Sequence, residues 1–189
     1  MTSTPQQQNE IHRNGIDVSA LYDTLDAVRA DGHLAQFRFR ARNQWLGGGH
    51  NRSCIQSFSA AGVEDHTRTV PFVLDADEPP ALLGKDAGAN PVEFVLHALA
   101  ACMTTSLTYH AAARGIDIQA IDSELEGDLD LRGFLGLSDE VRKGFQQVRV
   151  RMRVKTAASP QLLRELTRFS PVHDIVSRSL PVETLVETY

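Results

Sequence analysis

The chain has 189 residues, of which 42% are hydrophobic and 23% are charged, and its formal net charge is −5. This length and composition are typical of a single globular domain with a buried core. The negative charge and the scattered basic residues argue against a nucleic-acid-binding surface. The basic residues at 38–42 and 149–153 alternate with other residues, which indicates the solvent-facing side of a strand.

The two cysteines, Cys54 and Cys102, lie far apart in the sequence. They form neither a disulfide framework nor a CxxC pair, and such sparse usage is typical of a reducing cytoplasm. The first ten residues lack the pattern of a secretory signal, and the apolar stretch 94–107 is too short and too polar to cross a membrane. We therefore expect a cytoplasmic protein with no membrane or nucleic-acid partner.

The first part of the chain predicts a helix followed by an antiparallel meander. Apolar residues recur at three- and four-residue spacing between Asp17, a suitable N-cap, and Ala30, and Gly32 can end the helix. Three segments with strand-like alternation follow, with a glycine-rich turn after the first. These segments are 34–46, 53–61 and 67–74. We expect residues 1–33 to form an N-terminal tail and helix, and residues 34–189 to form the main domain.

The clearest element is a long helix from Pro91 to Arg114. Asn90 is a good N-cap, Pro91 suits the first helical position, and Gly115 is a good terminator. At about 1.5 Å per residue the helix would be roughly 36 Å long. Its middle is apolar on nearly every side, so it must be enclosed by other elements. A small sheet from one chain covers only one side, and we therefore predict a homodimer with a large apolar interface.

The rest of the chain predicts two more strands, at 116–131 and 146–156, joined by a segment with a helical turn capped at Ser138. Two Ser-Pro pairs then open two helices, because serine is a good N-cap and proline suits the next position. These pairs are Ser159-Pro160, whose helix runs to about Phe169, and Ser170-Pro171. Residues 181–189 have the pattern of a final strand. The predicted fold class is α+β, with antiparallel strands around a long central helix and helices near the C-terminus.

Cys102 is the main candidate for a reactive atom, since a thiolate is a strong nucleophile. The alternative is that Cys102 is a small buried hydrophobic residue, as free cysteines often are. At about 100° per residue, several neighbours share its face of the helix, whereas His97 and Glu93 point elsewhere. These neighbours are Val95, Ala98, Leu99, Thr105, Ser106 and Tyr109. Glu93 stands three residues after the Asn90 cap, where helix capping alone would explain it.

Other chemistries have weaker support. The histidines show no metal-ligand spacing, so we expect no metal ion. His110 could reach Ser106 one turn away, which would suit a hydrolase, but no third partner is evident. The glycines of residues 84–90 follow no phosphate-binding pattern and indicate a loop.

Two sequences in the long helix together resemble the central-helix signature of the OsmC/Ohr family, the osmotically induced and organic hydroperoxide resistance proteins. They are Asn90-Pro91-Val92-Glu93 and Leu99-Ala100-Ala101-Cys102. The order of elements is also similar over about residues 34–189. The resemblance implies an OsmC-like fold in an intertwined homodimer, with the two long helices at its centre.

The resemblance also implies an activity, the reduction of a small-molecule hydroperoxide without a cofactor. Cys102 matches the thiolate that attacks the O–O bond and becomes a sulfenic acid. In the family, a second cysteine in a Cys-Pro turn condenses with it, and a thiol reductant restores both. An arginine near the N-terminal strands and a glutamate at the start of the helix stabilise the thiolate and position the peroxide. Their nearest matches here are Arg52 and Glu93.

The sequence departs from this pattern at two places. Ser170 stands in the resolving position, and a hydroxyl cannot form the disulfide. The glutamate of the hydroperoxide-resistance branch follows the proline directly, where this chain has Val92. Cys54 could replace the resolving cysteine if its Cα atom comes within about 7 Å of the Cα atom of Cys102, or it could be a plain strand residue. Together with Val92 and Tyr109, Cys54 is an expected pocket residue.

Two functions remain open. The first is a peroxiredoxin-like hydroperoxide reductase that uses Cys102 as a single cysteine, resolved by a small or protein thiol, in oxidative-stress defence. The second is a non-catalytic dimeric protein that binds an apolar small molecule in the family's interface pocket, with Cys102 as inert lining.

Overall fold

The computed structural model describes residues 12–178 and 181–186. Residues 1–95 and residues 96–189 form two compact units, and their boundary falls near the start of the long helix. The division into 1–33 and 34–189 stays a prediction. The expected tail at residues 1–10 lies outside the described residues.

The first unit begins with a short hairpin that the sequence analysis did not predict. Strand β1 (His12–Arg13) pairs with β2 (Ile16–Asp17) around Asn14 and Gly15, which have φ angles of 53° and 79°. An Asn-Gly pair is the preferred sequence for a two-residue hairpin turn, because both positions need positive φ. Helix α1 (Val18–Ala30) follows, and the Asp17 side chain accepts the N–H of Ala20 at 3.0 Å. The predicted helix and its cap are confirmed.

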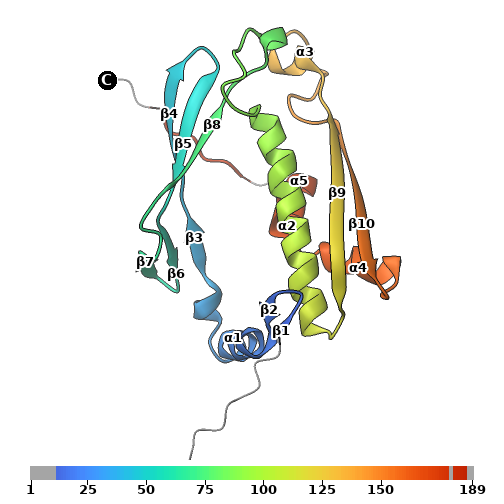
Figure 1. The fold of residues 1–189 in the computed structure, drawn as a ribbon. Coiled ribbons are helices and arrows are strands. Elements are labelled where there is room, and N and C mark those ends of the chain that lie inside the picture. The colour runs from blue at the N-terminus through green and yellow to red at the C-terminus, as the bar shows by residue number, and fades with distance from the viewer. Residues whose placement is uncertain (1–11, 179–180, 187–189) are drawn as a thin grey trace, which may run out of the picture. The chain divides into compact units, whose positions relative to one another are not determined.

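The predicted antiparallel meander is present, but its first two strands are each broken and pass from one sheet to another (Figure 1). The third predicted segment, 67–74, is a strand only from Phe72 onward, and a separate short strand at Val63–Asp65 precedes it. One sheet has the order β4-β5-β8 and the other β3-β6-β7, and all pairs are antiparallel. The strands are β3 (Phe37–Phe39), β4 (Arg42–Gly47), β5 (His50–Ile55), β6 (Phe58–Ala60), β7 (Val63–Asp65) and β8 (Phe72–Ala76). A 3-10 turn, η1 (Gly32–Ala35), precedes β3.

Asp77 organises the loop between β8 and the long helix. Its side chain is 2% exposed and accepts the backbone N–H groups of Glu78, Lys85 and Ala87 at 2.8, 3.1 and 3.2 Å. These hydrogen bonds hold the pKa of Asp77 below its ordinary value, led by the bond from Ala87. The loop contains one 3-10 turn, η2 (Pro80–Leu82), and delivers the chain to Asn90.

Helix α2 (Pro91–Ala113) is the predicted long helix, and its N-terminus carries a reciprocal cap. The N–H of Val92 donates to Oδ1 of Asn90 at 3.0 Å, while the N–H of Asn90 donates to Oε2 of Glu93 at 2.9 Å. One side of the helix is buried along a four-residue repeat. This stripe consists of Leu99, Met103, Leu107 and Ala111.

In the second unit, a long antiparallel hairpin of β9 (Ile118–Asp128) and β10 (Gln147–Thr156) lies beside α2 (Figure 1). Its inner face joins Leu107, Ala111 and Leu166 in a hydrophobic core. On its outer face, acidic residues of β9 lie opposite basic residues of β10. Arg149, for example, binds both Glu126 and Asp128. The alternating basic residues of 149–153 are therefore one side of a strand, as predicted.

The connection between β9 and β10 differs from the expectation. Its helical turn is α3 (Leu131–Phe134), and its N-cap is Asp130 rather than Ser138. The Asp130 carboxylate accepts the N–H of Arg132 at 3.0 Å and also binds the Arg132 guanidinium. The Asp130 carboxyl consequently has a pKa of about 2. This double interaction fixes the turn directly after β9.

Both predicted Ser-Pro helix starts are confirmed. Ser159 caps α4 (Pro160–Thr167), and Ser170 caps α5 (Pro171–Ser177). The predicted final strand is wrong for residues 181–186, which have no regular secondary structure, and residues 187–189 lie outside the described residues. Its apolar side chains Val182, Leu185 and Val186 are exposed, because no strand edge pairs with this segment in the described part of the chain. The fold class, α+β with antiparallel sheets, is as predicted.

Candidate functional site

Cys102 lies in the middle of α2, half-buried, beside the buried stripe of the helix. Within the described residues its thiol forms no disulfide and no hydrogen bond. Met103 next to it is buried, whereas Tyr109, which helical geometry places on the same side as Cys102, is 47% exposed. Cys102 therefore stands at the border between the buried and exposed sides of the helix.

Glu93 and Val92 are fixed at the N-terminus of α2 by the cap described above. One carboxylate oxygen of Glu93 accepts the Asn90 N–H, so the capping role expected from the sequence is confirmed. Glu93 and Cys102 are nine residues apart on one helix, which puts their Cα atoms about 13 Å apart along its axis. A role for Glu93 in positioning a peroxide stays a prediction.

Arg52 lies on β5 and forms a two-pronged ion pair with Asp75 on the neighbouring strand β8. Nε and Nη2 of Arg52 donate to the two Asp75 oxygens at 2.8 and 3.0 Å, and Nε2 of His50 lies 3.2 Å from Oδ1 of the same carboxylate. Arg52 first, and then His50, holds the pKa of Asp75 below its ordinary value. The Arg52 guanidinium is therefore oriented by Asp75 within its own sheet.

Cys54 lies two residues after Arg52 on the same strand, between Arg42 on β4 and Val73 on β8. It is a free, half-buried thiol at a small pocket of about 140 Å³. The pocket lies where the long strands break, and its other lining residues are Arg40, Ala41, Arg42, Gln56 and Ser57. Cys54 and Arg52 belong to the first unit, whereas Cys102 belongs to the second, so their cooperation stays a prediction.

Ser170, in the resolving position of the family, is 1% exposed. Its hydroxyl oxygen accepts the N–H of His173 at 3.1 Å and caps α5. This structural role accounts for a buried hydroxyl at that position.

The pairing of Ser106 with His110 is not formed. Nδ1 of His110 accepts a hydrogen bond from the Arg114 guanidinium at 3.1 Å, and its ring stacks on Phe169 with centroids 4.1 Å apart. Burial and the Arg114 charge lower the pKa of His110. Because one ring nitrogen is occupied and Ser106 forms no hydrogen bond with His110 in the described residues, the geometry gives a hydrolase no support.

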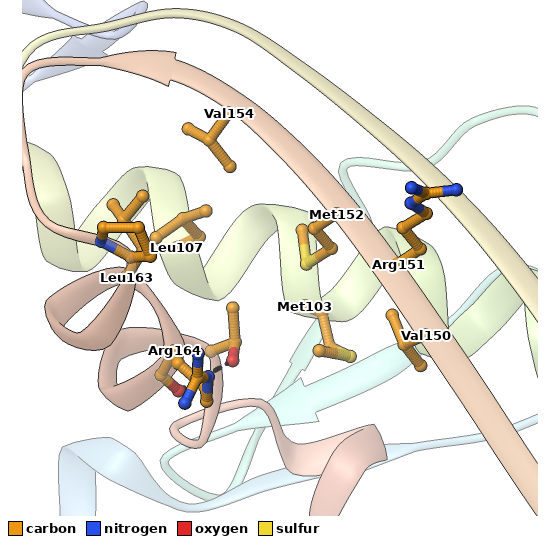
Figure 2. A pocket seen from close by; sticks show the side chains of 10 residues that line it. Met103, Leu107, Val150, Arg151, Met152, Val154, Leu163 and Arg164 are labelled. Atoms are coloured by element: carbon orange, nitrogen blue, oxygen red, sulfur yellow. Dashed lines mark hydrogen bonds between the residues drawn. The ribbon is translucent and has the colours of Figure 1, made fainter.

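A cavity that the sequence analysis missed lies between α2, β10 and α4 (Figure 2). Its volume is about 420 Å³, within the range of small-molecule sites. Most of its lining is apolar, and Arg164 of α4 contributes a charged group. The lining residues are Met103, Leu107, Val150, Arg151, Met152, Val154, Pro160, Leu163, Arg164 and Thr167. The periodicity of the sequence predicts which side of each of these three elements is buried. It does not predict that α2, β10 and α4, which are distant in the sequence, pack together.

Together these observations define an α+β protein whose long central helix carries a free, half-buried cysteine. The family described as OsmC-like protein matches residues 84–185, which is more than half of the chain. The chain therefore belongs to the OsmC-like protein family. No curated protein sequence matches it significantly.

Solved structures agree with this fold. An OsmC-like protein from Mycoplasma pneumoniae has a TM-score of 0.55 at 16% identity, over 75% of this chain and 89% of that one. An OsmC-like protein of unknown function from Vibrio cholerae has a TM-score of 0.51 at 14% identity, over 77% and 95%. An organic hydroperoxide resistance protein from Legionella pneumophila has a TM-score of 0.46 at 18% identity, over 73% and 88%. Identities this low show the fold alone.

None of the helices in the described residues is long and apolar enough to cross a membrane. Nor do those residues contain a group of three or more histidine, cysteine or acidic side chains arranged to hold a metal ion.

Proposed function

We propose that this chain is a thiol-dependent hydroperoxide reductase in which Cys102 is the single peroxidatic cysteine. The observation that carries the proposal is a free, half-buried thiol on the central helix, inside the segment that matches the OsmC-like family. Of the two cysteines, Cys102 is the one within that segment.

The proposed cycle consumes two thiol groups of a reductant, or one dithiol, for each hydroperoxide. The Cys102 thiolate attacks the terminal oxygen of the hydroperoxide, the O–O bond breaks, and the leaving alkoxide takes a proton to become an alcohol. Cys102 is then a sulfenic acid. One reductant thiol condenses with it and releases water, and a second thiol breaks the resulting mixed disulfide. In this scheme Arg52 and Glu93 would help to orient the peroxide and stabilise the thiolate.

The test compares Cys102→Ala with Cys54→Ala, which removes the other thiol. With an organic hydroperoxide and a dithiol reductant, we expect Cys102→Ala to lower peroxide consumption to the rate without protein. Cys54→Ala should keep at least half of the wild-type rate, because the proposal gives it no role. Mass spectrometry should find the added oxygen on Cys102 in the Cys54→Ala variant. A wild-type rate equal to that of Cys102→Ala would refute the proposal.

The second candidate function is non-catalytic binding of an apolar small molecule, and Ser170 is the observation that favours it. A buried helix cap occupies the place of the family's resolving cysteine, so the two-cysteine cycle is absent at this position. Alkylation kinetics on the Cys54→Ala variant separate the two functions. A catalytic Cys102 reacts rapidly with iodoacetamide in the folded protein, whereas an inert lining residue reacts only after denaturation.

We further propose that the protein is an intertwined homodimer in the cytoplasm. Large apolar side chains are widely exposed on the single chain, among them Trp45 at 72% and Phe72 at 59%. Val95 and Tyr109 on α2 are also exposed, and such surfaces mark interfaces. Both described cysteines are free thiols, which suits a reducing compartment. Light scattering at micromolar concentration should give twice the chain mass of 20.8 kDa. A stable monomer would contradict the dimer.

A further inference from the structure

The cavity between α2, β10 and α4 has walls of two kinds. Figure 2 shows Met103 and Leu107 on α2 and Val150, Met152 and Val154 on β10, with Leu163 and Arg164 of α4 beside them. Leu107 is fully buried and Met103 nearly so, so the inner wall is apolar. An apolar wall of this kind binds an alkyl chain without any polar group being left unpaired.

The guanidinium of Arg164 provides a positive charge at the wall of the cavity. Its guanidinium forms no hydrogen bond or ion pair with any residue that the structure describes, and the Thr167 hydroxyl nearby donates to the Arg164 carbonyl at 2.9 Å. Arg151 also contributes to the wall, but Figure 2 shows its side chain on the opposite side of β10 from Val150 and Met152. The cavity therefore combines a hydrocarbon interior with the Arg164 guanidinium, which has no partner among the described residues.

We propose that this cavity binds a free alkyl carboxylate, with its chain among the apolar side chains and its carboxylate on the Arg164 guanidinium. An arginine fork matches the two oxygens of a carboxylate, and a charge-assisted hydrogen bond adds orientation to the apolar contact. A neutral alkane would gain nothing from the guanidinium charge, and an alkyl ammonium would be repelled by it. The two kinds of wall thus select an anionic amphiphile.

This site goes beyond the proposed reductase function, because Cys102 does not line the cavity and no thiol chemistry is involved. Binding should be unchanged in Cys102→Ala. The peroxide assay and the binding assay can therefore fail independently of each other.

The methionines give a direct measurement. The chain has three, Met1, Met103 and Met152, and the two internal ones both line the cavity. We expect decanoate, below its micelle concentration, to shift the methyl NMR signals of Met103 and Met152 saturably in protein labelled with ¹³C at the methionine methyl groups. Affinity should rise about fourfold per added methylene from hexanoate to octanoate to decanoate.

The charge is tested with Arg164→Gln and its matched control Arg153→Gln, both at exposed positions where the fold should be retained. Arg153 lies on β10 and does not line the cavity. Arg164→Gln should weaken decanoate binding about tenfold while leaving decanol binding unchanged. Arg153→Gln should change neither affinity. This pattern assigns the carboxylate to Arg164 and not to the general positive charge of β10.

Three results would overturn the proposal. One is the absence of saturable shifts at Met103 and Met152, which would mean that the cavity is closed or occupied by protein in solution. Another is equal affinity for decanol and decanoate, which would show that the charge is not recognised. The last is an equal loss of decanoate affinity in Arg153→Gln and Arg164→Gln.

Discussion

Replacing Gly84 by alanine is expected to destabilise the protein by about 3 kcal/mol or more. A Cβ atom at this position would lie 1.7 Å from the carbonyl oxygen of Glu78 and 2.3 Å from its carbonyl carbon. Both are backbone atoms, so no side-chain rotation can relieve the clash. The loop around Asp77 is additionally fixed by three backbone N–H groups bound to that carboxylate, which limits how far it can shift.

Gly32→Ala is the matched control, because a Cβ there has no neighbour within 4 Å and its φ angle is not in the left-handed region. Its effect should lie within about 0.5 kcal/mol of zero. Urea denaturation followed by far-UV circular dichroism measures both variants. Equal stability of the two variants would mean that the loop tolerates a Cβ and that its described close approach is wrong.

The loop matters to the candidate site because it leads into the cap of α2. Nδ2 of Asn90 donates to a carboxylate oxygen of Glu78, the residue whose carbonyl would clash with a Cβ at position 84. A shift of Glu78 would therefore remove a hydrogen bond from Asn90, and through Asn90 it would loosen the position of Glu93. If Glu93 positions a peroxide, a Gly84→Ala variant that still folds should also lose activity.

Features fixed by neighbours in the sequence were predictable, and features fixed by distant residues were not. The caps Asp17, Asn90, Ser159 and Ser170 act on N–H groups two or three residues away, so a short motif contains all the information. The breaks at residues 40–41 and 56–57 leave no such trace, because alternation shows which side a residue faces but not where a strand bends.

The candidate site follows the same rule. The capping role of Glu93 was readable from its three-residue distance to Asn90, and the place of Cys102 on α2 was readable from helical periodicity. The pairing of Arg52 with Asp75 joins residues 23 positions apart through the register of β5 and β8, which the sequence does not specify. The cavity lined by Arg164 forms because α2, β10 and α4 pack against one another. Periodicity shows which side of each element is buried, but it does not show which elements pack together.

Leu107→Ala is expected to cost between about 2 and 5 kcal/mol of stability, because a buried leucine loses its apolar contacts and leaves a space that its neighbours fill only in part. Leu107 is 0% exposed and packs with Ala111 and Leu166 in the core of the second unit. The matched control is Leu137→Ala, the same chemical change at a side chain that is 71% exposed, which should cost less than about 0.5 kcal/mol.

Thermal and urea unfolding of both variants should be compared with wild type at one protein concentration, since dimerisation would make the melting temperature depend on concentration. A loss below 1 kcal/mol for Leu107→Ala would mean that the contact between α2 and α4 contributes little to stability.

Leu107 also lines the cavity between α2, β10 and α4, so the truncation enlarges a space that is already present. If decanoate occupies that space, it should restore part of the lost stability in Leu107→Ala, in proportion to the logarithm of its concentration above the dissociation constant. Such a rescue would show that the space left by the Leu107 side chain is part of the cavity that binds decanoate.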